Sequence, residues 1–129
     1  MIRLRRYIGI PFVDRGDQFT GADCYGLLRL FYREELGISI MDPHISCRET
    51  GKVFSQYLVE VRRHWVEVTE PGEFCGVAMA TDPKLPGIVN HFGIWIGGRL
   101  LQTLSGVGSH VVPADKHRNR IIKYYQWQA

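Results

Sequence analysis

The chain has 129 residues, of which 45% are hydrophobic and 22% are charged. This length and composition favour one ordered domain over residues 1–129 with its own hydrophobic core, and they exclude an intrinsically disordered chain. The net charge of +3 comes from scattered lysines and arginines, which favour a solvated surface and no nucleic-acid partner.

Cysteine usage and the apolar segments limit the class of protein further. Cys24, Cys47 and Cys75 are odd in number and widely spaced, so we expect no disulfide framework, no C-x-x-C zinc site and no bound metal. No apolar region typical of a signal peptide occurs near the start, and no run approaches the roughly 18 apolar residues of a membrane helix. We therefore expect a domain without its own signal peptide or membrane span.

An irregular segment followed by a helix is expected at the start of the chain. Gly9, Pro11, Gly16 and Gly21 interrupt residues 1–22, which predicts an irregular lead-in that wraps the domain. In residues 23–36, DCYGLLRLFYREEL, Cys24 begins a pattern of apolar residues at i, i+3, i+4 and i+7, and Gly37 is positioned as a C-cap. The pattern predicts an amphipathic helix that begins at or just before Cys24.

The rest of the chain predicts a second helix and then a sheet. An apolar stripe indicates a helix over residues 50–62, and short runs rich in β-forming residues follow after the Pro-Gly pair at 71–72. Helices followed by strands predict the α+β class, with N-terminal helices packed on a central antiparallel β-sheet. The expected strands are residues 74–80, 91–96, 100–104, 110–112 and 121–127.

The position of Cys24 marks it as a candidate nucleophile. At the first turn of a helix, unpaired backbone N–H groups and the helix dipole favour the thiolate form that reacts. The alternative is a small buried residue, which is the usual state of a free cysteine and the one we expect for Cys47 and Cys75.

A predicted hairpin places a histidine beside a glutamine. Residues 91–104 contain two β-forming runs around a Gly-Gly pair suited to a two-residue turn. If Ile96 faces Arg99, then His91 and Gln102 are diagonal neighbours on one face, about 7–8 Å apart at Cα. Gln102 can then accept from one imidazole nitrogen while the other nitrogen faces a thiol.

The alternative for His91 and Gln102 is a structural role, because each residue type alone at such a position is more often packed or solvated. Their joint placement with a cysteine at a helix start favours a catalytic group instead. Among the remaining histidines, only His110 is a rival for the orienting role.

Five short motifs occur in order along the chain: GIPF (9–12), GADCYGLL (21–28), LGI (36–38), PGE (71–73) and HFGIWIG (91–97). In sequence and order they resemble the motifs of the NlpC-type family of papain-like cell-wall cysteine peptidases. The resemblance implies a papain-like domain with Cys24 as nucleophile, His91 as base and Gln102 at the third, orienting position. It also implies cleavage of peptidoglycan stem peptides at the D-glutamyl to diamino-acid bond, with no metal or organic cofactor.

The sequence departs from the family pattern at two positions that are expected to bind substrate. Phe12 stands where the family has a tyrosine whose hydroxyl helps at the oxyanion site. Tyr25 replaces a small serine after the nucleophile and is expected to reshape the pocket for the stem peptide. Asp23 is expected to cap the helix, with contact to a substrate amine as the alternative.

The bulky aromatic after Cys24 and the run LLRLFYREELGI resemble tail-tip and tail-assembly proteins of long-tailed bacteriophages. This implies a protein made in the host cytoplasm, carried at the virion tail tip with other tail-tip proteins, and acting at the bacterial cell wall. Two alternatives stay open. One is a catalytically silent structural module of the same fold, which Phe12 and Tyr25 favour, and the other is a papain-like amidase or acyltransferase on another substrate.

Overall fold

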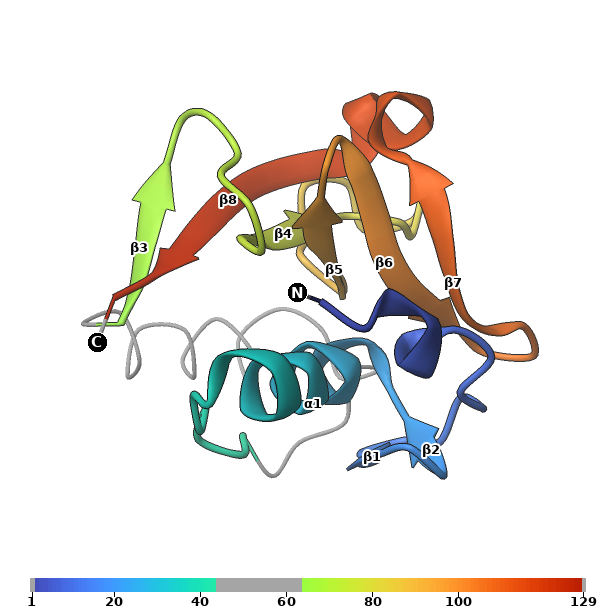
Figure 1. The fold of residues 1–129 in the computed structure, drawn as a ribbon. Helices are drawn as coiled ribbons and strands as arrows, with labels where there is room; N and C mark the ends of the chain where they lie inside the picture. The colour runs from blue at the N-terminus through green and yellow to red at the C-terminus, as the bar shows by residue number, and fades with distance from the viewer. Residues whose placement is uncertain (1, 44–63, 129) are drawn as a thin grey trace.

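Residues 2–43 and 64–128 are described by a computed structural model. Helix α1 packs across one face of a six-stranded antiparallel sheet with strand order β3-β8-β4-β5-β6-β7 (Figure 1). The fold class is therefore α+β, as the sequence predicts. The elements are η1 (Leu4–Tyr7), β1 (Asp17–Gln18), β2 (Gly21–Ala22), α1 (Cys24–Leu36), β3 (Trp65–Val68), β4 (Gly76–Met79), β5 (His91–Ile96), β6 (Arg99–Leu104), β7 (Gly108–Pro113), η2 (Ala114–Arg120) and β8 (Ile121–Trp127), where η marks a 3-10 helix.

The expected elements agree closely with the observed ones. The expected strands at 91–96 and 121–127 coincide with β5 and β8, and the other three differ from β4, β6 and β7 by one or two residues at their ends. The sequence pattern missed β3, a short edge strand that pairs with β8. The helix expected at 50–62 lies outside the described residues. In the described part of the chain, no helix is long and apolar enough to cross a membrane.

Helix α1 has a clear stop and start in its sequence. The side chain of Asp23 accepts a hydrogen bond from the Gly26 backbone N–H at 2.7 Å, which satisfies one of the unpaired donors of the first turn. At the other end, Gly37 adopts a left-handed conformation (φ 67°), and its N–H donates to the Tyr32 carbonyl. The helix therefore begins at Cys24 and ends at Leu36 because of the residues on either side of it.

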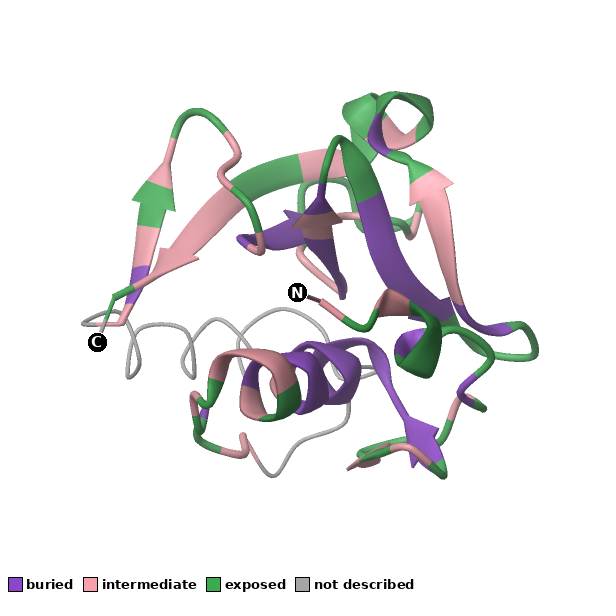
Figure 2. Cartoon of the chain, viewed as in Figure 1, coloured by how far each residue is buried: buried purple, intermediate pink, exposed green. Residues whose placement is uncertain are grey.

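The core lies on both faces of the sheet. On the α1 face, Ile94 and Leu101 pack with the apolar side of the helix. On the opposite face, Leu100 packs with Trp95 and with Ala114 of η2. Figure 2 shows the buried residues concentrated in α1 and in the central strands β4, β5 and β6. Because side chains alternate along a strand, this division also decides the direction of the polar side chains in β5 and β6.

The N-terminal segment joins the start of β7 to the start of α1. Gly9 donates to the carbonyl of Ser109 at 2.9 Å, and the Ser109 N–H donates to the carbonyl of Ile10 at 2.9 Å. The Ile10 N–H donates to the Ser109 hydroxyl at 2.7 Å, and the Ala22 N–H donates to the carbonyl of Pro11 at 3.0 Å. The segment Gly9-Ile10-Pro11 thus links β7 to β2, directly before the helix.

Candidate active site

Cys24 is the first residue of α1 and is 2% exposed. The residue before it, Asp23, is a structural anchor, because its second carboxylate oxygen accepts from the Arg15 backbone N–H at 2.9 Å. The same carboxylate caps the helix, as expected from the sequence, while its contact with a substrate amine stays a prediction. Asp23 therefore fixes the loop and the helix start together, so that the backbone around Cys24 has one arrangement.

His91 and Gln102 form the hydrogen bond that the hairpin predicts. The turn contains two glycines with positive φ, Gly97 at 55° and Gly98 at 81°, and Ile96 pairs with Arg99 as expected. In this register His91 Nε2 lies 2.9 Å from Gln102 Oε1. Both side chains project from the sheet face that carries Trp95 and Leu100, because these residues alternate with those that contact α1.

The environment of His91 favours its neutral form. The side chain is 5% exposed, and burial lowers the pKa of the imidazole because the charged form would lose its hydration. The hydrogen bond to Gln102 acts in the opposite direction, and the nearby His117 and His110 lower the pKa further. A neutral imidazole has one nitrogen free to accept a proton, which a general base requires.

His110 lies on the other side of Gln102 from His91. Gln102 pairs with His110 across β6 and β7, and Gln102 Nε2 lies 3.3 Å from His110 Nε2. The second ring nitrogen of His110, Nδ1, lies 2.8 Å from the carbonyl oxygen of Gly108. His110, the alternative candidate for the orienting role, is therefore a direct neighbour of Gln102. The side chains of His91, Gln102 and His110 form one row across β5, β6 and β7.

Tyr25, which follows Cys24, is part of the hydrophobic core. Its ring packs edge-on against Phe92 at 5.3 Å between centroids, and its hydroxyl accepts a hydrogen bond from Trp65 Nε1 at 3.0 Å. The residue is 3% exposed. This contact brings the first turn of α1 to the start of β5, because Tyr25 follows Cys24 and Phe92 follows His91. A role for Tyr25 in shaping the substrate pocket stays a prediction.

The backbone of Phe12 lies beside the residues that precede α1. Phe12 forms a parallel bridge with Ala22 and is half-buried. Its contact with substrate stays a prediction. Ser109, which holds this segment in place, could not be found by sequence reasoning, because the bond from the Ile10 N–H to its hydroxyl spans 99 residues.

Cys75 is buried and differs chemically from a reactive thiol. Cys24 and Cys75 are both free of disulfides. Burial raises the pKa of Cys75 to about 11, which keeps this thiol protonated at neutral pH. Cys47 lies outside the described residues. Within residues 2–43 and 64–128, no group of three or more His, Cys, Asp or Glu side chains is arranged to hold a metal ion.

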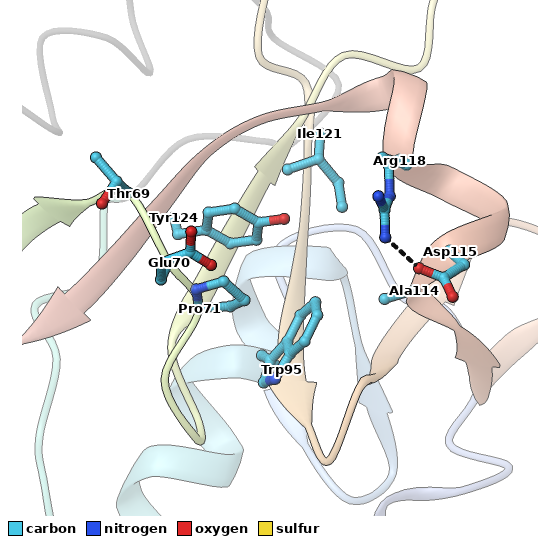
Figure 3. Close-up of a pocket in the computed structure, with 9 residues that line it drawn as sticks. All are labelled: Thr69, Glu70, Pro71, Trp95, Ala114, Asp115, Arg118, Ile121 and Tyr124. Atoms are coloured by element: carbon cyan, nitrogen blue, oxygen red, sulfur yellow. Dashed lines mark hydrogen bonds and ion pairs between the residues drawn. The ribbon is translucent and has the colours of Figure 1, made fainter.

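A pocket of about 380 Å³ lies on the sheet face away from α1. Figure 3 shows Trp95 and Tyr124 in its middle, with Glu70 on one side and the ion pair of Asp115 and Arg118, 2.6 Å long, on the other. None of the predicted site residues lines this pocket. It is therefore separate from the row of polar side chains described above.

No family model and no curated protein sequence matches the chain. Among solved structures, the NlpC/p60 domain of the peptidoglycan hydrolase SagA matches with a TM-score of 0.61 and 20% identity, over 97% of this chain and 92% of that one. An NlpC/P60 family protein from Bacillus cereus ATCC 10987 matches with a TM-score of 0.68 and 19% identity, over 95% of this chain.

A third solved structure, similar to a lipoprotein of the NLP/P60 family from Staphylococcus aureus subsp. aureus Mu50, matches with a TM-score of 0.63 and 20% identity over 96% of this chain. This chain covers only 37% of the Bacillus cereus protein and 38% of the Staphylococcus aureus protein. The chain therefore has the papain-like fold of NlpC/p60 domains.

Proposed function

We propose that this chain is a thiol hydrolase of the bacterial cell wall, with Cys24 as nucleophile, His91 as base and Gln102 as the group that orients the base. The observation that carries the proposal is the buried bond from His91 Nε2 to Gln102 Oε1 at 2.9 Å, in a fold that also contains a helix-start cysteine. The fold is shared with a peptidoglycan hydrolase domain, which supports the stem peptide as substrate.

In this proposal the Cys24 thiol reaches the imidazole of His91 around the end of the sheet. Helix α1 packs on one face, whereas His91 projects from the other face, so contact through the sheet is impossible. His91 is the first residue of β5, and the packing of Tyr25 on Phe92 brings the helix start to this end of the strand. The Gly9-Ile10-Pro11 segment supports the arrangement, since it fastens the helix start to β7, two strands away from β5.

The reaction begins when His91 accepts the proton of the Cys24 thiol. The thiolate attacks the carbonyl carbon of the D-glutamyl to diamino-acid bond, and backbone N–H groups at the start of α1 stabilise the oxyanion. A carbon–sulfur bond forms, the carbon–nitrogen bond breaks, and His91 returns the proton to the leaving amine. Water then hydrolyses the thioester, which releases the carboxylate and restores the thiol. Phe12 stands where the family has a tyrosine, so no phenol hydroxyl at this position donates to the oxyanion.

Delivery by a bacteriophage tail is part of the same proposal. It is supported by the sequence resemblance to tail-tip proteins in the run after Cys24. In this scheme the domain is carried at the tail tip among other tail proteins and acts when the tail meets the cell wall.

The test is digestion of purified peptidoglycan followed by mass spectrometry of the soluble products. Wild-type protein and the control variant Cys75→Ala should both release fragments with a new carboxyl end at D-glutamate, whereas Cys24→Ala should release none. Absence of products from folded wild-type protein would reject the hydrolase and favour the silent structural module. Products that also form with Cys24→Ala would reject the thiol mechanism.

A further inference from the structure

We propose that His110 is a positioning residue that fixes the orientation of the Gln102 amide and, through it, the tautomer of His91. The catalytic importance of His110 rests on the proposed function. The tautomers of His91 and His110 do not depend on it. The proposal follows from the direction of each hydrogen bond in the row that runs from His91 through Gln102 and His110 to the Gly108 carbonyl.

The direction of the hydrogen bond at the Gly108 end of the row is fixed. A backbone carbonyl only accepts, so the contact of 2.8 Å between His110 Nδ1 and the Gly108 oxygen requires a proton on Nδ1. In the neutral ring the other nitrogen, Nε2, then has a free lone pair and acts as an acceptor.

The Gly108 carbonyl is itself held in place. Gly108 has a φ of 88°, a conformation that favours glycine, and a Cβ there would lie 2.9 Å from the carbonyl oxygen of Ile10. The next residue, Ser109, is fixed by three hydrogen bonds to Gly9 and Ile10. The acceptor at the end of the row is therefore part of a rigid backbone.

This polarity is passed along the row to His91. Because His110 Nε2 accepts, Gln102 presents its amide nitrogen to it at 3.3 Å and must turn its amide oxygen toward His91. The amide oxygen only accepts, so His91 Nε2 carries a proton. The remaining nitrogen of a neutral His91, Nδ1, is then the acceptor available for the Cys24 proton. Without His110 the amide can turn over, and a turned amide would favour the tautomer with its proton on Nδ1.

In this proposal His110 sets the orientation of the Gln102 amide, and the amide sets the tautomer of His91. The tautomers can be measured directly. In protein labelled with ¹⁵N at histidine, ring spectra report which nitrogen of each imidazole carries the proton. Cys24→Ala serves as the background, so that a thiolate does not charge His91. We expect His91 protonated at Nε2 and His110 protonated at Nδ1. A proton on Nε2 of neutral His110 in this background would overturn the proposal without any further variant.

Three variants in the same background test the direction. His110→Phe should leave His91 in a mixture of both tautomers, whereas His110→Gln, whose amide oxygen can accept from Gln102, should keep a single tautomer. Gln102→Met should mix the tautomers of His91 but leave His110 protonated at Nδ1, because the Gly108 carbonyl still holds it. A single unchanged tautomer of His91 in Gln102→Met, or in folded His110→Phe, would contradict the role.

The activity measurement separates this proposal from the proposed function. With Cys24 present, His110→Phe should lower kcat by roughly three- to tenfold with little change in KM, and His110→Gln should recover most of the loss. An inactive wild type with the expected tautomers would reject the hydrolase and leave the positioning row intact. Equal kcat in wild type and His110→Phe would remove His110 from the catalytic scheme.

Discussion

The backbone carbonyl of Gly16 occupies the space that a side chain at Gly26 would need. The same carbonyl accepts a hydrogen bond from the Asp23 backbone N–H at 3.1 Å, so it cannot move without breaking the bond that orients the residue before Cys24. The glycine two residues after Cys24 is therefore required by a close approach of backbone rather than by an unusual φ.

Gly26→Ala should lower the free energy of unfolding by roughly 1–3 kcal/mol, because the added methyl group displaces the Gly16 loop. Gly76→Ala is the matched control, since its Cβ would meet the flexible Leu28 side chain at 3.5 Å, an ordinary contact. Urea denaturation of both variants gives the comparison. Equal urea midpoints for the two variants would show that the Gly16 loop moves aside at no cost in stability.

Tyr25→Ser, which restores the family's residue at this position, should destabilise the domain by about 3–5 kcal/mol. The substitution leaves a cavity between Phe92 and Trp65 and removes the acceptor of the indole N–H. Tyr25→Phe keeps the ring and should cost only about 1–2 kcal/mol. Thermal unfolding measures both, and a Tyr25→Ser variant as stable as wild type would place the ring outside the core.

Cys24 should be the first of the three thiols to react with iodoacetamide near neutral pH. Cys75 should stay unlabelled in the folded protein, because it is fully buried and its pKa is raised to about 11. Peptide mapping after a short exposure identifies the labelled residue. Earlier labelling of Cys47 or Cys75 would count against Cys24 as nucleophile.

Burial of neutral His91 should make the domain less stable as the pH falls below about 6.5. The folded-state pKa is lowered, so in this window the unfolded chain binds a proton that the folded protein does not, and stability rises with pH. His117 has a lowered pKa as well, so the comparison must isolate one residue. The difference in urea-unfolding free energy between wild type and His91→Gln should therefore depend on pH, and parallel pH curves would contradict the shift.

Gln102→Ala should lower turnover by roughly one to two orders of magnitude, less than His91→Ala, because the nucleophile and the base remain. The change falls on kcat, since the amide holds His91 rather than substrate. Gln102→His should keep much of the activity, as the family resemblance implies. Release of peptidoglycan fragments over time gives the rates. A Gln102→Ala rate equal to wild type would remove the orienting role from Gln102 and, with it, the role of His110, which acts through the Gln102 amide.

The local parts of this site could be predicted from sequence because they depend on neighbouring residues. A Gly-Gly pair sets the turn between β5 and β6, and the register of that turn brings Gln102 to His91. The bounds of α1 could also be predicted from sequence, because Asp23 and Gly37 lie on either side of one apolar stripe. In each case the partners lie within about a dozen residues, where periodicity and turn chemistry decide the geometry.

The parts that could not be predicted depend on distant contacts. Nothing in the local sequence of Ser109 indicates that it binds Ile10. The burial of Tyr25 depends on Trp65 and Phe92, which come from β3 and β5, and its role in shaping a pocket stays a prediction. A short strand such as β3 has too few residues for its alternation to be distinguished from a loop.

The bond between Ile10 and Ser109 also sets the time at which the site can assemble during translation. Helix α1 leaves the ribosome long before β7, and the segment before it can pair with Ala22 at once but cannot be fastened to β7 until Ser109 has also emerged. Contacts at such a separation form late, after the entropy of closing a long loop has been overcome. A nascent chain that ends before β7 thus carries Cys24, His91 and Gln102 but lacks His110 and Ser109, so the proposed site is complete only when synthesis of the domain is nearly finished.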